Sequence, residues 1–405
     1  MLASHTRRFH FLAALLILLA PLKAVAENVM IGGVPVPAEV RPGAGESPFF
    51  GAWFGAWGAK WRTVLIVETV EDDRIVATYA VGPNGSFKGG NRRLEGRIDG
   101  ERAMLEGPSY VIDIALTPHG TMRARYNGDQ GFAVLNRGDL AGNHPWIGGA
   151  AEMIETDLTE DGAAIRLKTL VFKPSEGASF PLALINHGSS AYSGDRDVFD
   201  EVWVDPWIAD LLVERGWLVA FPQRRGRGGS DGLYDEGFKA DRSAYSCDGA
   251  VTQKGAERAL EDIEAAIAAL RLRPDVRIGP VLIGGMSRGG ALSVAWAGRN
   301  PQRAHGVVNF VGGWLSEGCG DAEDVNKTLF AEGGPFPRDT LWLYGADDPF
   351  YSLPYSRKNF AAFINAGGRG AFHEFALNGE NNGHWVQSVP TLWQDQLIGY
   401  LDALD

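Results

Sequence analysis

One stretch of the chain, residues 281–298 (VLIGGMSRGGALSVAWAG), constrains the fold more than any other part. It opens with an apolar, β-branched run at 281–283, which is typical of a buried parallel strand, and it ends in helix-forming residues. Between them stands the pattern Gly285-x-Ser287-x-Gly289. Strand, sharp turn and helix form the context in which such a serine sits on a strained turn with its hydroxyl exposed. The pattern therefore predicts that Ser287 is a nucleophile, and the alternative is a glycine-rich turn in which the serine is incidental.

The order of segments predicts two domains in this chain of 405 residues. From residue 150 to 405, strand-like runs alternate with amphipathic helices, which favours an α/β domain with a mostly parallel sheet and helices on both faces. Before it, residues 49–140 hold short β-rich runs separated by turn signals such as Asp99-Gly100, which favours a small all-β barrel or sandwich. Residues 27–48 are rich in proline and glycine without a period, and we expect them to form a linker.

A serine nucleophile needs a base to take its proton and an acid to orient that base. In a strand–turn–helix setting of this type the three groups follow in the order Ser, Asp or Glu, His. After Ser287, the run LWLYG leads to Asp348, and the run NGENNGHW places His384 after a further strand. Asp347 is the alternative acid, and His373, which lies inside a strand-like run, is the alternative base. We favour Asp348 because the strand-end pattern Gly345-x-x-Asp348 places it at the usual position of the acid. We favour His384 because it lies in a Gly-Asn loop after a strand end, where catalytic groups of open α/β sheets lie.

Two backbone N–H groups are expected to bind the oxyanion that forms during attack on a carbonyl. One belongs to Arg288, directly after Ser287. We assign the other to Ser189 or its neighbour, in the loop that follows the strand-like run PLALIN. Both donors would then come from turns at the same edge of the predicted sheet.

The segment RRGRGGSDG, residues 224–232, is expected to lie beside the site. We count Arg225 and Ser230 as candidate substrate-binding residues, and the alternative is that the arginines hydrogen-bond to loop carbonyls. The segment lacks the spacing and the lysine of a phosphate-binding loop. No Cys, His and acidic residues have zinc-site spacing, and no dinucleotide-binding pattern follows a first strand. We therefore expect neither a metal nor a cofactor.

The N-terminus is typical of a secretory signal peptide. Arg7 and Arg8 precede an apolar run at 11–22, and small residues up to Ala26 fit a cleavage site. We expect a signal peptide at residues 1–26 and a mature protein that is exported, to the periplasm or outside the cell. An uncleaved membrane anchor is the alternative.

Charge and hydropathy narrow the expected partners. The formal net charge is −12, which argues against nucleic acid because binding it needs a basic face. No later stretch has the apolar length of a membrane-spanning helix, so we expect no integral membrane segment in the mature chain.

The chain has two cysteines, Cys247 and Cys319. An even number of cysteines in an exported protein favours a disulfide, and we expect these two to pair. The alternative is two unrelated buried thiols.

Five groups of residues carry a resemblance to a known family. They are His187-Gly188, Arg225-Gly226-x-Gly228-x-Ser230-x-Gly232, Gly285-x-Ser287-x-Gly289, Gly345-x-x-Asp348 and Gly383-His384. On these residues the chain from about 150 to 405 resembles the α/β-hydrolase superfamily, and it is most similar to the dienelactone hydrolase-like and prolyl oligopeptidase-like branches. Ser287 stands where dienelactone hydrolases proper use a cysteine, and the preceding β-rich region is far shorter than the propeller of prolyl oligopeptidases.

The resemblance implies a serine hydrolase with Ser287, His384 and Asp348 as its triad. We expect it to cleave a carboxylic ester of a small molecule through an acyl-enzyme intermediate. The alternatives are a serine peptidase that acts on short peptides and a non-catalytic ligand-binding protein that retains the fold.

Overall fold

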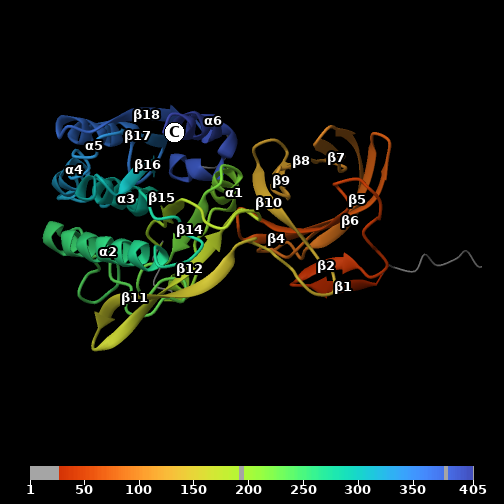
Figure 1. Cartoon of the computed structure of the whole chain (residues 1–405), viewed down its shortest axis with the longest axis horizontal. Coiled ribbons are helices and arrows are strands. Elements are labelled where there is room, and N and C mark those ends of the chain that lie inside the picture. Colours follow the sequence, from red (N-terminus) through yellow and green to blue (C-terminus); the bar gives the residue numbers. More distant parts are fainter. Residues whose placement is uncertain (1–26, 191–195, 378–381, 405) are drawn as a thin grey trace, which may run out of the picture.

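The computed structural model describes residues 27–190, 196–377 and 382–404, and it consists of an all-β part followed by an α/β part (Figure 1). This architecture confirms the predicted fold class. The predicted signal peptide, residues 1–26, lies outside the described residues.

The all-β part is built around a closed antiparallel barrel in which each strand pairs with its neighbours in the chain and β10 pairs with β3. Along β3 and β4, side chains alternate between the barrel interior, which holds Trp53 and Leu65, and the outer face, which holds Phe54 and Val64. The interior is filled by side chains, as expected for an eight-stranded barrel. The strands are β3 (Gly51–Trp57), β4 (Trp61–Glu71), β5 (Arg74–Val81), β6 (Gly90–Asp99), β7 (Arg102–Glu106), β8 (Val111–Leu116), β9 (Thr121–Tyr126) and β10 (Gly131–Gly138).

The structure corrects the expectation that residues 27–48 form a linker. Within them, β1 (Asn28–Ile31) and β2 (Val34–Pro37) form an antiparallel hairpin whose Val34 and Val36 pack on the outer face of the barrel. The prolines in this segment argued against strands in the sequence analysis, although an edge strand tolerates proline. The Gly-Gly pair between the two strands, with φ of 54° and 89°, supplies the tight turn.

The α/β part is organised on an eight-stranded sheet with the order β11-β12-β14-β13-β15-β16-β17-β18. β11 and β12 are antiparallel to their neighbours, and the pairs from β14 to β18 are parallel. The strands are β11 (Ala150–Glu160), β12 (Ala163–Phe172), β13 (Leu182–Asn186), β14 (Leu218–Pro222), β15 (Val281–Met286), β16 (Ala304–Phe310), β17 (Asp339–Gly345) and β18 (Arg369–Phe375). β13, β14 and β15 are buried along their whole length, which explains their nearly continuous apolar sequences.

Helices cover both faces of this sheet: α1 and α6 lie on the side toward the barrel, and α2, α3 and α4 lie on the other side (Figure 1). The α-helices are α1 (Pro206–Glu214), α2 (Gly249–Leu270), α3 (Arg288–Arg299), α4 (Ala322–Ala331), α5 (Leu353–Asn365) and α6 (Pro390–Asp402). Two short 3₁₀ helices are η1 (Arg196–Phe199) and η2 (Gly383–Ser388). Because the strands from β13 to β18 run parallel, the loops after them gather at one edge of the sheet.

The barrel docks on α1 through both apolar and charged contacts. Phe132 of β10 belongs to the hydrophobic core of the α/β part and meets the Trp207 ring edge-on, with 5.4 Å between the ring centroids. Asp210, buried on the same helix, accepts hydrogen bonds from Arg123 Nε at 2.5 Å and from the Thr121 hydroxyl at 2.5 Å, and His119 Nε2 lies 2.7 Å from it.

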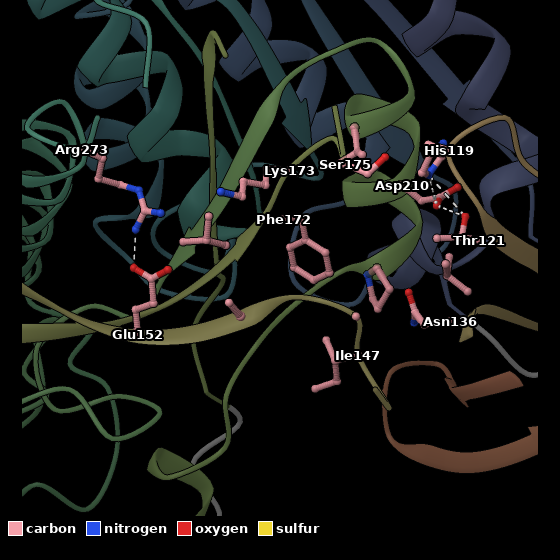
Figure 2. A pocket seen from close by; sticks show the side chains of 16 residues that line it. His119, Thr121, Asn136, Ile147, Glu152, Phe172, Lys173, Ser175, Asp210 and Arg273 are labelled. Carbon is pink, nitrogen blue, oxygen red and sulfur yellow. Dashed lines mark hydrogen bonds and ion pairs between the residues drawn. The ribbon is translucent and has the colours of Figure 1, made fainter. Parts of the chain in front are cut away.

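A cavity of about 410 Å³ lies where the two parts meet (Figure 2). The Asp210 cluster with His119 and Thr121 lies at one side of it, and the Arg273–Glu152 ion pair lies at the other. The residues that line this cavity do not include the predicted triad, so the cavity is separate from the predicted catalytic residues.

Candidate active site

Ser287 sits on a sharp turn between β15 and α3. Its backbone has φ 55° and ψ −122°, a region that side-chain-bearing residues rarely adopt, and its N–H donates to the Phe310 carbonyl at 2.9 Å. The flanking glycines are required by space. A Cβ on Gly285 or on Gly289 would lie 2.6 Å or 2.3 Å from the carbonyl oxygen of Asn186. The strained turn predicted from the Gly-x-Ser-x-Gly pattern is therefore present at the carboxyl edge of the sheet. Ser287 is only 3% exposed, however, so the residue is buried and not exposed as the pattern predicted.

His384 and Asp348 form a hydrogen-bonded pair, with 2.9 Å between Nδ1 and Oδ2. The other carboxylate oxygen of Asp348 accepts the backbone N–H groups of Phe350 and Tyr351, at 2.8 Å and 3.1 Å, which fixes the carboxylate in place. Asp348 is 4% exposed and His384 is 6% exposed, so water screens the pair little.

The two alternative candidates lie elsewhere. Asp347 is exposed and adopts a positive φ of 59°, whereas its neighbour Asp348 is buried. His373 lies within β18, the edge strand of the sheet, where it lines a second cavity together with Tyr400.

Tyr351 connects the serine to the acid–base pair. Burial raises the pKa of Tyr351, while the charge of Arg288 and a side-chain hydrogen bond with Ser287 act in the opposite direction. Its hydroxyl also donates to the Gly313 carbonyl at 2.9 Å, and its ring centroid lies 5.8 Å from that of His384. Sequence reasoning did not identify Tyr351, and a signal that could have found it is its position three residues after Asp348.

The loop after β13 passes directly against the nucleophile. A Cβ on Gly188 would lie 3.1 Å from Ser287 Cβ and 3.7 Å from Ser287 Oγ. Ser189, the predicted second oxyanion donor, follows in this loop and is exposed, while Arg288, the predicted first donor, begins α3.

His187 holds the same loop as a neutral ring. Its Nε2 accepts the Arg224 backbone N–H at 3.0 Å, so Nδ1 carries the hydrogen and donates it to the Gly188 carbonyl at 2.7 Å. Burial, and after it the charge of Arg224, hold the pKa of His187 well below its usual value.

The two predicted substrate-binding residues are engaged in internal contacts. The buried Arg225 guanidinium lies against Asp262 and Glu261 of α2, with distances of 2.5 Å and 3.0 Å. The Ser230 hydroxyl donates to the Gln223 carbonyl at 2.6 Å. The alternative interpretation has the arginines of this segment hydrogen-bond to loop carbonyls, whereas Arg225 pairs with carboxylates of α2. Because the polar groups of Arg225 and Ser230 are engaged within the protein, our proposal below does not use them as substrate contacts.

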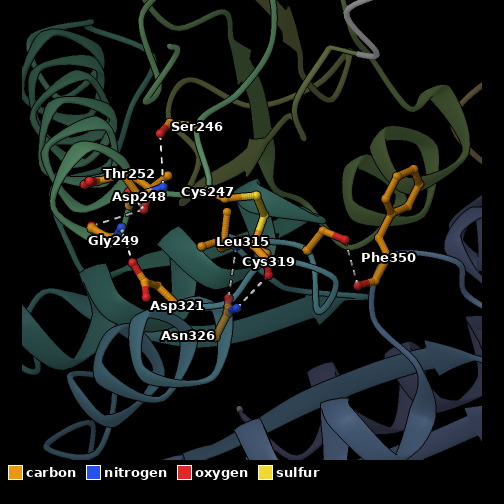
Figure 3. The surroundings of a disulfide bond; sticks show 11 residues. Ser246, Cys247, Asp248, Gly249, Thr252, Leu315, Cys319, Asp321, Asn326 and Phe350 are labelled. Carbon is orange, nitrogen blue, oxygen red and sulfur yellow. Dashed lines mark hydrogen bonds between the residues drawn. A yellow bond between two sulfur atoms is a disulfide. The ribbon is translucent and has the colours of Figure 1, made fainter.

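Cys247 and Cys319 form a disulfide, as predicted (Figure 3). Their Cα atoms are 5.2 Å apart, and the bond joins segments that are 72 residues apart in the chain. Beside it, the Gly249 N–H at the start of α2 donates to Asp321, at the start of α4, at 2.8 Å. The disulfide therefore clamps the beginnings of two helices on one face of the sheet.

Two negative findings apply to the described residues. Among them, no group of three or more His, Cys, Asp or Glu side chains is arranged to hold a metal ion. No helix formed by them has the length and apolar character that crossing a membrane demands.

Known families and solved structures resemble parts of this chain. The sequence model of the dienelactone hydrolase family matches residues 202–339. Similar solved structures include a predicted CIB-like hydrolase from Thermoplasma acidophilum, with 16% identity, 62% of this chain and 98% of that chain covered, and a TM-score of 0.39. They also include Est1E from Butyrivibrio proteoclasticus with bound ferulic acid, with 14% identity, 62% and 100% covered, and a TM-score of 0.42. A putative dienelactone hydrolase from Klebsiella pneumoniae subsp. pneumoniae has 14% identity, 62% and 98% covered, and a TM-score of 0.40. No curated protein sequence matches the chain.

Proposed function

We propose, from the premise that this chain is a member of the α/β-hydrolase superfamily, that it is an exported serine hydrolase that cleaves carboxylic esters. The observation that carries the proposal is the 2.9 Å contact between His384 Nδ1 and Asp348 Oδ2. It leaves Nε2 as the ring atom that can accept a proton, which is the arrangement a general base needs.

The proposed reaction is acyl transfer in two steps. Ser287 Oγ attacks the ester carbonyl carbon while His384 Nε2 takes the hydroxyl proton, and Asp348 stabilises the imidazolium. The backbone N–H groups of Arg288 and Ser189 bind the oxyanion. The C–O bond to the leaving alcohol then breaks and the alcohol takes the proton from His384. Water attacks the acyl-enzyme with the same base, releasing the acid and the free serine.

The strained backbone at Ser287 supports this assignment. A non-glycine residue at φ 55° and ψ −122° costs free energy, on the order of 1–3 kcal/mol, and such strain clusters at functional sites. The disulfide between Cys247 and Cys319 supports export, because disulfides persist in oxidising compartments.

The test is labelling of the purified protein with a fluorophosphonate probe, followed by peptide mapping of the adduct. We expect the adduct on Ser287, no adduct in Ser287→Ala, and turnover of simple esters that falls at least about 10³-fold in that variant. A parallel panel of aminoacyl amides separates esterase from peptidase activity. Undiminished ester turnover in Ser287→Ala would overturn the proposal.

A further inference from the structure

We infer that Glu236 is a positioning residue of the oxyanion hole, because its carboxylate joins Arg224, which holds the loop after β13, to Arg288, which follows the nucleophile. This inference rests on the proposed function, since it concerns the two N–H donors assigned there. Glu236 is 3% exposed and lies in the segment between β14 and α2, remote in sequence from the triad.

The Arg288 side chain is held on every side. Its guanidinium lies between two aromatic rings, 3.9 Å from the Tyr245 centroid and 4.3 Å from the Trp314 centroid. Its Nε donates to the Trp314 carbonyl at 3.0 Å, and its Nη1 donates to the Glu236 carbonyl at 2.8 Å. The same Nη1 lies 3.5 Å from the Glu236 carboxylate. The side chain thus fixes the first residue of α3, whose own N–H is the first oxyanion donor.

The Arg224 side chain likewise holds the loop that follows β13. Its Nη1 donates to the His187 carbonyl at 2.9 Å, and its Nη2 lies 3.4 Å from the Gly188 carbonyl. These are the two peptide groups that precede Ser189, so the position of the Ser189 N–H follows from them. The guanidinium is 2% exposed and cannot exchange these acceptors for water.

Glu236 is the link between the two arginines. One carboxylate oxygen accepts Arg224 Nε at 2.5 Å, and the other accepts the Tyr234 hydroxyl at 2.9 Å and faces Arg288. Burial alone would raise the pKa of Glu236, yet the charges of Arg224 and Arg288 hold it below its usual value. The carboxylate is therefore ionised at neutral pH, and each arginine is oriented by the same negative charge.

Positioning and simple electrostatics predict opposite effects of losing this charge. Two guanidinium groups and one carboxylate carry one net positive charge, which favours a nearby oxyanion. If Glu236 acted through its charge alone, its neutralisation would strengthen oxyanion binding. If Glu236 instead fixes the positions of Arg224 and Arg288, its neutralisation lets both oxyanion donors shift. Oxyanion binding then weakens, because it depends on the geometry of these N–H donors.

The experiment compares Glu236→Gln with Asp262→Asn in the full-length protein. Asp262 is a matched control, because it is 3% exposed and pairs with Arg225, the arginine that adjoins Arg224. We expect Glu236→Gln to lower kcat by about 10- to 100-fold with KM within about twofold of wild type, and Asp262→Asn to change kcat by less than about threefold. The affinity for a trifluoromethyl ketone, whose serine adduct carries an oxyanion, should fall in Glu236→Gln by the same factor as kcat/KM.

The remaining outcomes are also decisive. Equal kcat losses in the two variants, or unchanged ketone affinity in Glu236→Gln, would overturn the inference about Glu236. The proposed function would still hold in that case if the wild-type protein turns over esters and is labelled at Ser287. A wild-type protein that is not labelled at Ser287 overturns both. If melting curves show that Glu236→Gln does not fold, Arg288→Lys is used instead. It keeps the charge and the backbone N–H but loses the fork of contacts, and retained kcat in it counts against positioning.

Discussion

At the scale of single residues, the neighbouring aspartates Asp347 and Asp348 differ in burial and in contact with His384. Asp348 is buried against His384, whereas Asp347 is exposed with φ 59°. We expect Asp348→Asn to lower kcat by roughly 10³- to 10⁴-fold, because an amide can present an N–H to Nδ1 and stabilise the wrong tautomer of the ring. Asp347→Asn is the matched control, since asparagine tolerates positive φ and should leave ester turnover nearly unchanged. Steady-state kinetics decide the assignment, and it is refuted if Asp347→Asn shows the larger loss.

Sequence patterns identified residues whose chemistry is tied to local backbone form. Ser287 stands in a turn that only glycine neighbours permit, and Asp348 and His384 follow strand ends. Tyr351 and Glu236 carried no such mark, because Tyr351 contacts Ser287 and Glu236 contacts Arg288, which lie far from them in the chain. The same reason explains Arg225: the sequence shows an arginine beside the site, but the acid that engages it lies on α2 and only the fold brings them together.

At the scale of elements, the disulfide makes a prediction about stability. It closes a loop of 72 residues between the starts of α2 and α4, and in the chain-entropy model such a loop stabilises the fold by about 4 kcal/mol. We expect the double variant Cys247→Ser, Cys319→Ser to lower the free energy of unfolding by about 2–4 kcal/mol, measured by urea denaturation. Wild-type protein treated with a reductant should show the same loss, and equal stability of the reduced and oxidised forms would contradict the prediction.

The elements themselves were predictable to different degrees. A continuous apolar sequence with β-branched residues predicts a buried parallel strand such as β15. The β1–β2 hairpin did not, because two prolines and a four-residue strand length fall below what a periodic pattern can reveal. The apolar character of Val34 and Val36 is explained only by the folded barrel, because both pack with Phe54 on its outer face.

At the scale of the whole molecule, the sequence predicted two domains but not how they meet. The contact includes Asp210, a carboxylate that is buried on α1 and would be a costly buried charge without the barrel. The barrel supplies the groups that offset this cost, from Arg123, His119 and Thr121. Phe132 adds apolar area to the same interface. The buried carboxylate on α1 is therefore explained by the barrel, and the barrel residues that contact it are explained by α1.

Asp210→Asn tests this coupling and its pH dependence. Burial would raise the pKa of Asp210, but the His119 hydrogen bond and the charge of Arg123 hold it below its usual value. A lowered folded-state pKa gives stability that is present above the unfolded value, about 4, and is lost as pH falls through the folded value. We expect Asp210→Asn to lower the free energy of unfolding by about 3 kcal/mol at pH 7, in chemical denaturation, and the difference from wild type to shrink below about pH 4.

The control for this variant lies one helical turn away. Glu214 also pairs with Arg123, but its side chain is 27% exposed, so Glu214→Gln should cost less than about 1 kcal/mol. Because Arg123 keeps this second partner, any larger loss in Asp210→Asn reports the buried carboxylate itself and not the arginine. Limited proteolysis between residues 139 and 149, the connection between the two parts, should quicken in Asp210→Asn and stay unchanged in Glu214→Gln. Equal stability and equal proteolysis of the two variants at pH 7 would mean that the apolar contact of Phe132 with Trp207 holds the two parts together without Asp210.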